Sequence, residues 1–173
     1  MLNEMTPVQQ LEQRALRQLL GQYATGITVI TALDPQHKKI GMTANSFTSV
    51  SLDPPLILWN IAKSATHFDD FTAAEYFAIN ILSEDQFHES RHFSRSAPDK
   101  FNGLNGVEDY MGIPILKESL TTFICRQYEL HEAGDHYIIV GEIEACRNQA
   151  GNPLVFHNGQ YKQANLHQAF AGA

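Results

Sequence analysis

The chain has 173 residues, of which 43% are hydrophobic and 18% charged, and its formal net charge is −7. A chain of this length can bury a full core without disulfides, so we expect a single domain over residues 1–173. The acidic balance disfavours nucleic acid or an anionic membrane as the main partner. No basic and apolar leader and no run of 18 apolar residues occurs, which predicts a cytoplasmic protein without a membrane span.

The first predicted element is an amphipathic helix within residues 1–23. The sequence Thr-Pro-Val-Gln at residues 6–9 has the pattern of a capping box, and apolar residues then recur at helical spacing as far as Tyr23. The β-branched run Ile27–Leu33 predicts a strand, and Ile40–Thr43 predicts a return strand.

Further strands are predicted at 47–52 and 56–61, on either side of Asp53-Pro54-Pro55, where we expect no strand pairing. Residues 64–71 predict a short helix, and a second capping box at 83–86 opens a helix towards Phe93. The remaining predicted strands are 76–82, 120–133, 137–147, 154–156 and 160–162, the last two joined by a tight turn at Asn158-Gly159. Because most strands follow one another directly, the pattern favours a mainly β fold, an antiparallel barrel over residues 24–165 with peripheral helices.

Polar side chains gather where the strands around residues 41–55 meet. Thr43, Asn45, Ser46 and Ser51 could bind a polar planar ligand, together with backbone N–H groups of the same segment. A polar bulge at the rim of a barrel would explain the same residues without any ligand.

A second segment, residues 60–66, suits an anion. Ser64 is expected to cap the following helix, and Lys63 lies beside it, so N–H donors and a cation would meet there. Arg95 and Lys100 could close over the anion from residues 93–101, although ordinary capping and a solvated helix end are the alternatives. Both segments, 24–66 and 90–101, carry more Lys and Arg than Asp and Glu.

The histidines and cysteines give no pattern typical of a metal site. His88 and His92 are spaced i, i+4 but lack the glutamate of a zinc-protease motif, and His131, Glu132 and His136 show no further ligand in a recognisable order. The two cysteines, Cys125 and Cys146, lack metal spacing and are expected to be unpaired thiols.

Several short motifs, in order along residues 20–165, resemble the flavin reductase family of the FMN-binding split barrel. They are TGITVIT at 25–31, GMTANSF at 41–47, SLDPP at 51–55, KSAT at 63–66, Phe93-Ser94 with Asp99-Lys100-Phe101, GDH at 134–136, and PLVF with GQY at 153–161. The family includes the small reductase components of two-component flavin monooxygenases.

This resemblance implies a homodimer of split barrels that binds FMN or FAD and uses NADH or NADPH. The flavin-binding positions that it implies are Thr43, Ala44, Asn45, Ser46, Ser51, Asn60, Ala62, Lys63, Ser64, Thr66, Phe93, Ser94 and Lys100. The nicotinamide-binding positions that it implies are Gly134, Asp135, His136 and Tyr161. The N-terminal helix lies outside the well-matched part, and the resemblance assigns it no role.

The activity implied is hydride transfer from NAD(P)H to FMN or FAD, with reduced flavin passing to a partner monooxygenase. We expect His136 to position the nicotinamide and not to act as an obligatory acid or base. A split-barrel enzyme with tightly bound FMN and a non-enzymatic flavin-binding electron carrier are the alternatives. The 134–136 motif favours the reductase over the carrier.

Overall fold

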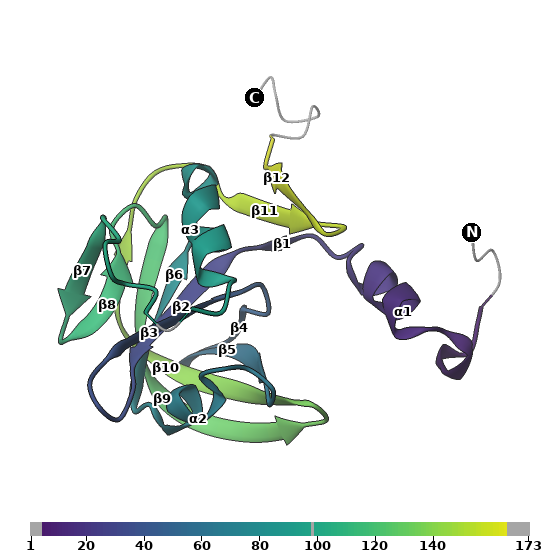
Figure 1. Cartoon of the computed structure of the whole chain (residues 1–173), viewed down its shortest axis with the longest axis horizontal. Coiled ribbons are helices and arrows are strands. Elements are labelled where there is room, and N and C mark those ends of the chain that lie inside the picture. The colour runs from purple at the N-terminus through teal and green to yellow at the C-terminus, as the bar shows by residue number, and fades with distance from the viewer. Residues whose placement is uncertain (1–4, 98, 166–173) are drawn as a thin grey trace.

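The computed structural model describes residues 5–97 and 99–165, and Figure 1 shows a β-rich body from which the N-terminal helix projects. Its main sheet has seven antiparallel strands in the order β3-β2-β6-β9-β10-β5-β4. Their bounds are β2 Thr28–Leu33, β3 Lys39–Ala44, β4 Thr48–Leu52, β5 Pro55–Ala62, β6 Tyr76–Ile81, β9 Thr121–Ala133 and β10 His136–Asn148. The predicted mainly β, antiparallel fold is therefore confirmed.

Two smaller sheets complete the body. One joins β1 (Thr25–Gly26), β11 (Leu154–His157) and β12 (Gln160–Gln163), and the other is the hairpin of β7 (Val107–Tyr110) and β8 (Ile113–Leu116). The tight turn at Asn158-Gly159 is confirmed, because both residues have positive φ, as a two-residue hairpin turn requires. The sequence pattern predicts no strand at β1, β7 or β8.

The core forms where alternate strand residues point to one face. In β5, Ile57, Trp59 and Ile61 are buried while their neighbours are partly exposed, which is the period-2 pattern of a strand with one covered face. The Trp59 ring packs edge-on against Phe71 and Phe77, with ring centroids 5.3 and 6.0 Å apart. These aromatic contacts join β5 to β6 and to the helix α2 (Phe68–Ala73).

A buried asparagine links four strands. The Asn80 amide on β6 donates to the carbonyl oxygen of Val29 and to the hydroxyl of Thr31, both on β2. Its side-chain oxygen accepts the backbone N–H of Leu116 on β8 and the hydroxyl of Thr122 on β9. A fully buried amide is tolerated here because both of its ends have partners.

The N-terminal helix is shorter than predicted. A 3₁₀ turn at Val8–Gln10 and a separate helix α1 at Gln13–Leu20 replace the single helix, and the first four of residues 1–23 lie outside the described part. None of the α1 residues is buried, and Figure 1 shows α1 standing apart from the sheets. Hydrogen bonds from Asn158 to Gly21 and from Gln22 to Asn158 connect the end of this segment to the β11–β12 turn.

Two other boundaries differ from the prediction. Pro55 pairs with Leu52 at the start of β5, so the pairing continues into the proline segment, where proline is tolerated as the first residue of a strand. The helix expected at 64–71 begins only at Phe68. The capping box at Ser83 is present, and it opens the turn Glu84–Gln86 that leads into α3 (Phe87–Phe93). No helix in the described residues is long and apolar enough to cross a membrane.

Candidate functional site

A cavity of about 400 Å³, here called the main cavity, lies between the end of β3, the segment before α2, the end of α3 and the β11–β12 hairpin. Its volume falls in the range of small-molecule sites, about 300 to 1,000 Å³. The residues that line it are Ile27, Met42, Thr43, Ala44, Asn45, Ser64, Ala65, Thr66, His67, Ser90, Phe93, Ser94, Arg95, Ser96, Lys100, Phe156 and Tyr161. They come from five separate parts of the sequence: residue 27 and the segments 42–45, 64–67, 90–100 and 156–161.

The charge of the main cavity is opposite to that of the whole chain. Arg95 and Lys100 line it, whereas no Asp or Glu is among its described lining residues. Serine and threonine hydroxyls supply further donors from two sides. A larger cavity elsewhere, about 510 Å³, is lined by Asp34, Asp70 and Glu75 and would repel an anion. Only the first of these two cavities suits a ligand that carries phosphate.

Hydrogen bonds join β3, α3 and β12 along one wall of the main cavity. The Thr43 hydroxyl donates to the backbone carbonyl of Ser90 at 2.6 Å. The Ser90 hydroxyl lies 3.0 Å from the hydroxyl of Tyr161. The Tyr161 ring packs edge-on against Phe87 and Phe156, with centroids 4.7 and 5.4 Å away. Thr43 and Tyr161 therefore connect the elements of this wall. Because the Thr43 hydroxyl donates its proton to the Ser90 carbonyl, it can only accept a hydrogen bond from a ligand.

Lys100 is a buried cation at the edge of the same cavity. Its ammonium group donates to the backbone carbonyls of Gly41 and Phe93, each at 2.9 Å, and the residue is 8% exposed. Burial lowers the pKa of Lys100 from its usual value of 10.5. With two of its donors bound to carbonyls, Lys100 fixes the end of α3 against β3 and leaves Arg95 as the more accessible cation.

Five predicted flavin positions, Ser46, Ser51, Asn60, Ala62 and Lys63, do not line the main cavity. The Ser46 hydroxyl accepts the backbone N–H of Asn60 at 2.9 Å and donates to the Asn60 carbonyl at 3.2 Å, so this pair ties the 45–47 segment to β5. The Asn60 side-chain oxygen is buried without a hydrogen-bond partner in the described part of the chain. Ser51 lies on β4 and accepts the N–H of Asp53, and Ala62 ends β5.

Lys63 and the 134–136 turn lie together beside the cavity and not in it. His136 pairs with Ala62 across β10 and β5, and the Lys63 N–H donates to the Asp135 carbonyl at 2.9 Å. The Lys63 ammonium binds the carboxylate of Glu132. Asp135 Oδ1 lies 2.7 Å from Nδ1 of His136, and this hydrogen bond lowers the pKa of Asp135 from 3.8. Gly134, with φ of 64°, forms the turn.

The helix N-terminus expected at Ser64 is absent from that position. Turns at Ala62–Ala65 and Ala65–Phe68 occupy the backbone before α2, and His67 is the residue that precedes the helix. Ser64 and Thr66 nevertheless line the main cavity, as loop residues. His67 Nδ1 lies 2.8 Å from the carboxylate of Asp70, one turn into α2.

Eight lining residues are not among the predicted site residues: Ile27, Met42, Ala65, His67, Ser90, Arg95, Ser96 and Phe156. Half of them, Met42, Ala65, His67 and Arg95, adjoin a predicted residue in sequence. Arg95 was considered as a cation that could close over an anion but was not assigned to the flavin site. Ser90 could not be found, because a serine inside a helix pattern carries no signal of what it faces.

Comparisons with known proteins show which family the chain resembles. The Stc3 reductase subunit of stachydrine N-demethylase from Rhizobium meliloti is 45% identical over 150 residues, which cover 87% of this chain and 65% of that protein. The FMN reductase (NADH) SmoA of Agrobacterium fabrum is 45% identical over 148 residues, 86% of this chain and 84% of SmoA.

A solved structure of the NADH:FAD oxidoreductase SgcE6 of Streptomyces globisporus, in complex with NAD and FAD fragments, superposes with a TM-score of 0.85 at 32% identity. The match covers 94% of this chain and 97% of SgcE6. The chain spans only 65% and 48% of the lengths of two Rhizobium meliloti relatives. Residues 20–165 match the flavin reductase like domain, and since this match takes in most of the chain, the protein belongs to the flavin reductase family.

Proposed function

We propose that this protein is an NAD(P)H-dependent flavin reductase that supplies reduced FMN or FAD to a partner monooxygenase. The observation that carries the proposal is the main cavity, which collects hydroxyls and two cations and no carboxylate in a chain of net charge −7. Such a lining suits the phosphate of a flavin nucleotide. Its apolar residues, among them Met42, Ala44 and Phe156, suit the ring system.

The residues present fit a flavin at both ends of the main cavity. Ser64, Thr66, Ser94 and Arg95 supply hydroxyls and a guanidinium for the ribityl chain and the phosphate. Elsewhere on the lining is Asn45. Asn45 and the adjacent Ser46 lie between β3 and β4 and belong to neither strand, so their backbone N–H groups lie outside the paired registers. Donors at this place would stabilise negative charge on the pyrimidine side of a reduced flavin.

A bound flavin supplies the redox chemistry, because its ring accepts a hydride from a reduced nicotinamide. The task of the chain is then to orient both rings and to exclude water. His136 stands on the β9–β10 hairpin beside the 62–66 segment, where its imidazole can contact a nicotinamide placed over the mouth of the cavity. Asp135 orients this imidazole through its hydrogen bond to Nδ1.

A steady-state matrix tests the proposal. Purified protein is mixed with NADH or NADPH and with FMN, FAD or riboflavin, and nucleotide oxidation is followed by absorbance. Turnover with added flavin supports a reductase that releases its flavin. Absence of turnover in all six mixtures contradicts the activity, and a yellow protein that oxidises NAD(P)H without added flavin indicates a tightly bound group instead.

The proposed assembly is a homodimer that meets a monooxygenase transiently. Apolar side chains remain exposed on α1 and on the edge strand β4, among them Leu20 at 67% and Leu52 at 94%. A second copy that covers them would remove an exposed apolar surface from water. Light scattering coupled to gel filtration measures the mass in solution, and a mass of one chain, 19.4 kDa, at micromolar concentration contradicts the dimer.

A further inference from the structure

A second cavity adjoins the main cavity on the outer side of α3. This α3 groove, about 470 Å³, is lined by Phe87, His88, Glu89, Arg91, His92, Arg95 and Leu104. Arg95 lines both cavities, so the two are neighbours that share this residue. A ligand with phosphate beside Arg95 in the main cavity could therefore continue into the α3 groove.

The α3 groove has the donors that a second phosphate requires. Arg91 and Arg95 line it, and neither forms an ion pair with any carboxylate in residues 5–97 and 99–165. The guanidinium of Arg91 stands 5.7 Å from the centre of the Phe87 ring, a position that keeps it at the groove while its charge stays unpaired. Guanidinium groups bind phosphate oxygens in pairs of parallel hydrogen bonds.

The rest of the groove suits a nucleoside. Leu104 offers an apolar surface, and the Glu89 carboxylate has one buried oxygen without a hydrogen-bond partner in the described residues. An oxygen of this kind is costly to leave unpaired, and it can accept a hydrogen bond from an adenine amino group or a ribose hydroxyl. The Glu89 carboxylate would repel a simple anion. The residues of the α3 groove therefore favour a ligand that carries hydrogen-bond donors as well as phosphate.

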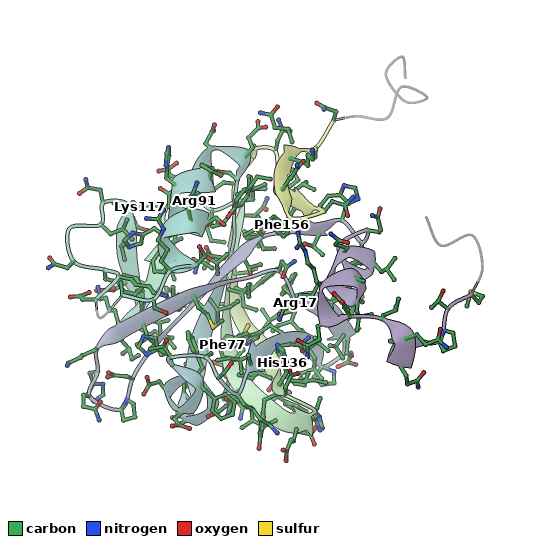
Figure 2. All side chains as sticks on the ribbon, turned by 45° about the vertical axis from the view of Figure 1, so that its right-hand side comes forward. Arg17, Phe77, Arg91, Lys117, His136 and Phe156 are labelled. Carbon is green, nitrogen blue, oxygen red and sulfur yellow. The ribbon has the colours of Figure 1, made fainter. Side chains whose placement is uncertain are left out.

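We propose that the α3 groove binds the adenosine diphosphate half of FAD, and that this protein therefore takes FAD in preference to FMN. The inference rests on the proposed function, in which the flavin ring and first phosphate occupy the main cavity. NADH contains the same adenosine diphosphate half, but its nicotinamide is expected at His136. Figure 2 shows Arg91 on α3 and His136 on the long hairpin far from each other, which favours FAD as the occupant.

Equilibrium titrations without nicotinamide test the groove. Fluorescence gives the Kd of FAD and of FMN for the wild type, Arg91→Ala, Arg91→Lys and the control Arg17→Gln, which removes an exposed arginine of α1 that lines neither cavity. We expect FAD to bind the wild type more tightly than FMN does. Loss of one charge-assisted contact in Arg91→Ala should raise the Kd of FAD about tenfold relative to that of FMN.

The two remaining variants and a competition with ADP test the same assignment. Arg91→Lys should keep part of the preference for FAD, and Arg17→Gln should keep all of it. Added ADP should raise the apparent Kd of FAD and leave that of FMN unchanged, because it competes only for the groove. Thermal unfolding of each variant verifies that the fold is retained.

Two results would overturn the proposal. One is an Arg91→Ala variant in which the Kd values of FAD and FMN rise by the same factor or stay the same. The other is a rise in the KM of NADH, measured with FMN as the flavin, which would assign the groove to the nicotinamide dinucleotide. In both cases the wild type would still reduce flavin, whereas a failure of the proposed function would appear as no reduction of either flavin.

Discussion

The ring of Phe93 occupies the space that a β-carbon on Gly41 would need. A β-carbon placed on Gly41 would lie 2.6 and 2.8 Å from two carbons of that ring, closer than side chains approach one another. The Lys100 ammonium holds the carbonyls of the same two residues at 2.9 Å. Strand β3 and the end of α3 are thus held so close that no side chain fits at position 41, and the main cavity lies directly beside this contact.

Gly41→Ala should therefore displace Phe93 into the main cavity. Overpacking of this kind costs about 1 to 3 kcal/mol of unfolding free energy, and we expect flavin to bind more weakly as well. Urea denaturation and flavin titration measure the two effects. Gly26→Ala is the matched control, because nothing lies within 4 Å of its β-carbon. Equal stability of the two variants would contradict the close contact.

Lys100→Met should destabilise the protein by about 1 to 3 kcal/mol near neutral pH, since two buried carbonyls lose their donor. The penalty should grow as the pH rises. The pKa of Lys100 is lower in the folded chain than the usual 10.5. At pH values between the pKa of Lys100 in the folded chain and its pKa in the unfolded chain, the unfolded chain binds more protons than the folded one. The free energy of unfolding of the wild type therefore rises with pH in this range, whereas that of Lys100→Met does not.

Urea denaturation from pH 7 to pH 10 measures this difference. The exposed Lys38→Met serves as the control, because it deletes the same group without burial. A wild-type advantage over Lys100→Met that shrinks towards pH 10 would show that the Lys100 pKa is not lowered.

Asn45→Ala and His136→Ala should separate the two ligands. Asn45 lines the main cavity, so its truncation should raise the Kd of flavin about tenfold and affect the KM of NADH less. His136 lies outside that cavity, on the hairpin, and its truncation should raise the KM of NADH with little change in flavin affinity. Flavin titrations and steady-state kinetics give both numbers, and parallel losses in the two variants would refute this division of roles.

The two thiols should differ in reactivity. Cys125 is fully buried, and burial raises its pKa to about 12, so it is almost wholly protonated at pH 8, whereas Cys146 is exposed. A disulfide reagent such as DTNB should label one thiol per native chain at pH 8 and two in 6 M guanidinium chloride. Rapid labelling of two thiols in the native protein would mean that Cys125 becomes exposed by local opening.

Most strands could be predicted because they carry a local signal. The β-branched run in β2 and the Asn158-Gly159 turn specify their structures within a few residues. The hairpin of β7 and β8 could not be predicted because its turn at Met111-Gly112 places methionine at positive φ. A bulky residue rarely adopts this conformation, so the sequence gives no turn signal there.

The helix start at residue 64 was misplaced for a different reason. Ser64 is a good capping residue, but the backbone from Lys63 to His67 follows turns that place this segment beside β10 and the main cavity. Such a path depends on long-range contacts. For the same reason the pairing of Ser46 with Asn60, and of Lys63 with Glu132, could not be anticipated from residues so far apart in sequence.

The four hydrogen bonds of Asn80 have a consequence for hydrogen exchange. The β7–β8 hairpin is a small sheet at one end of the body in Figure 1, and by its size it would be expected to open alone. The Leu116 N–H, however, is bound to an amide whose other partners lie in β2 and β9. We therefore expect that proton to exchange more slowly than the N–H groups of the exposed strand β7, because its bond joins β8 to the strands of the core.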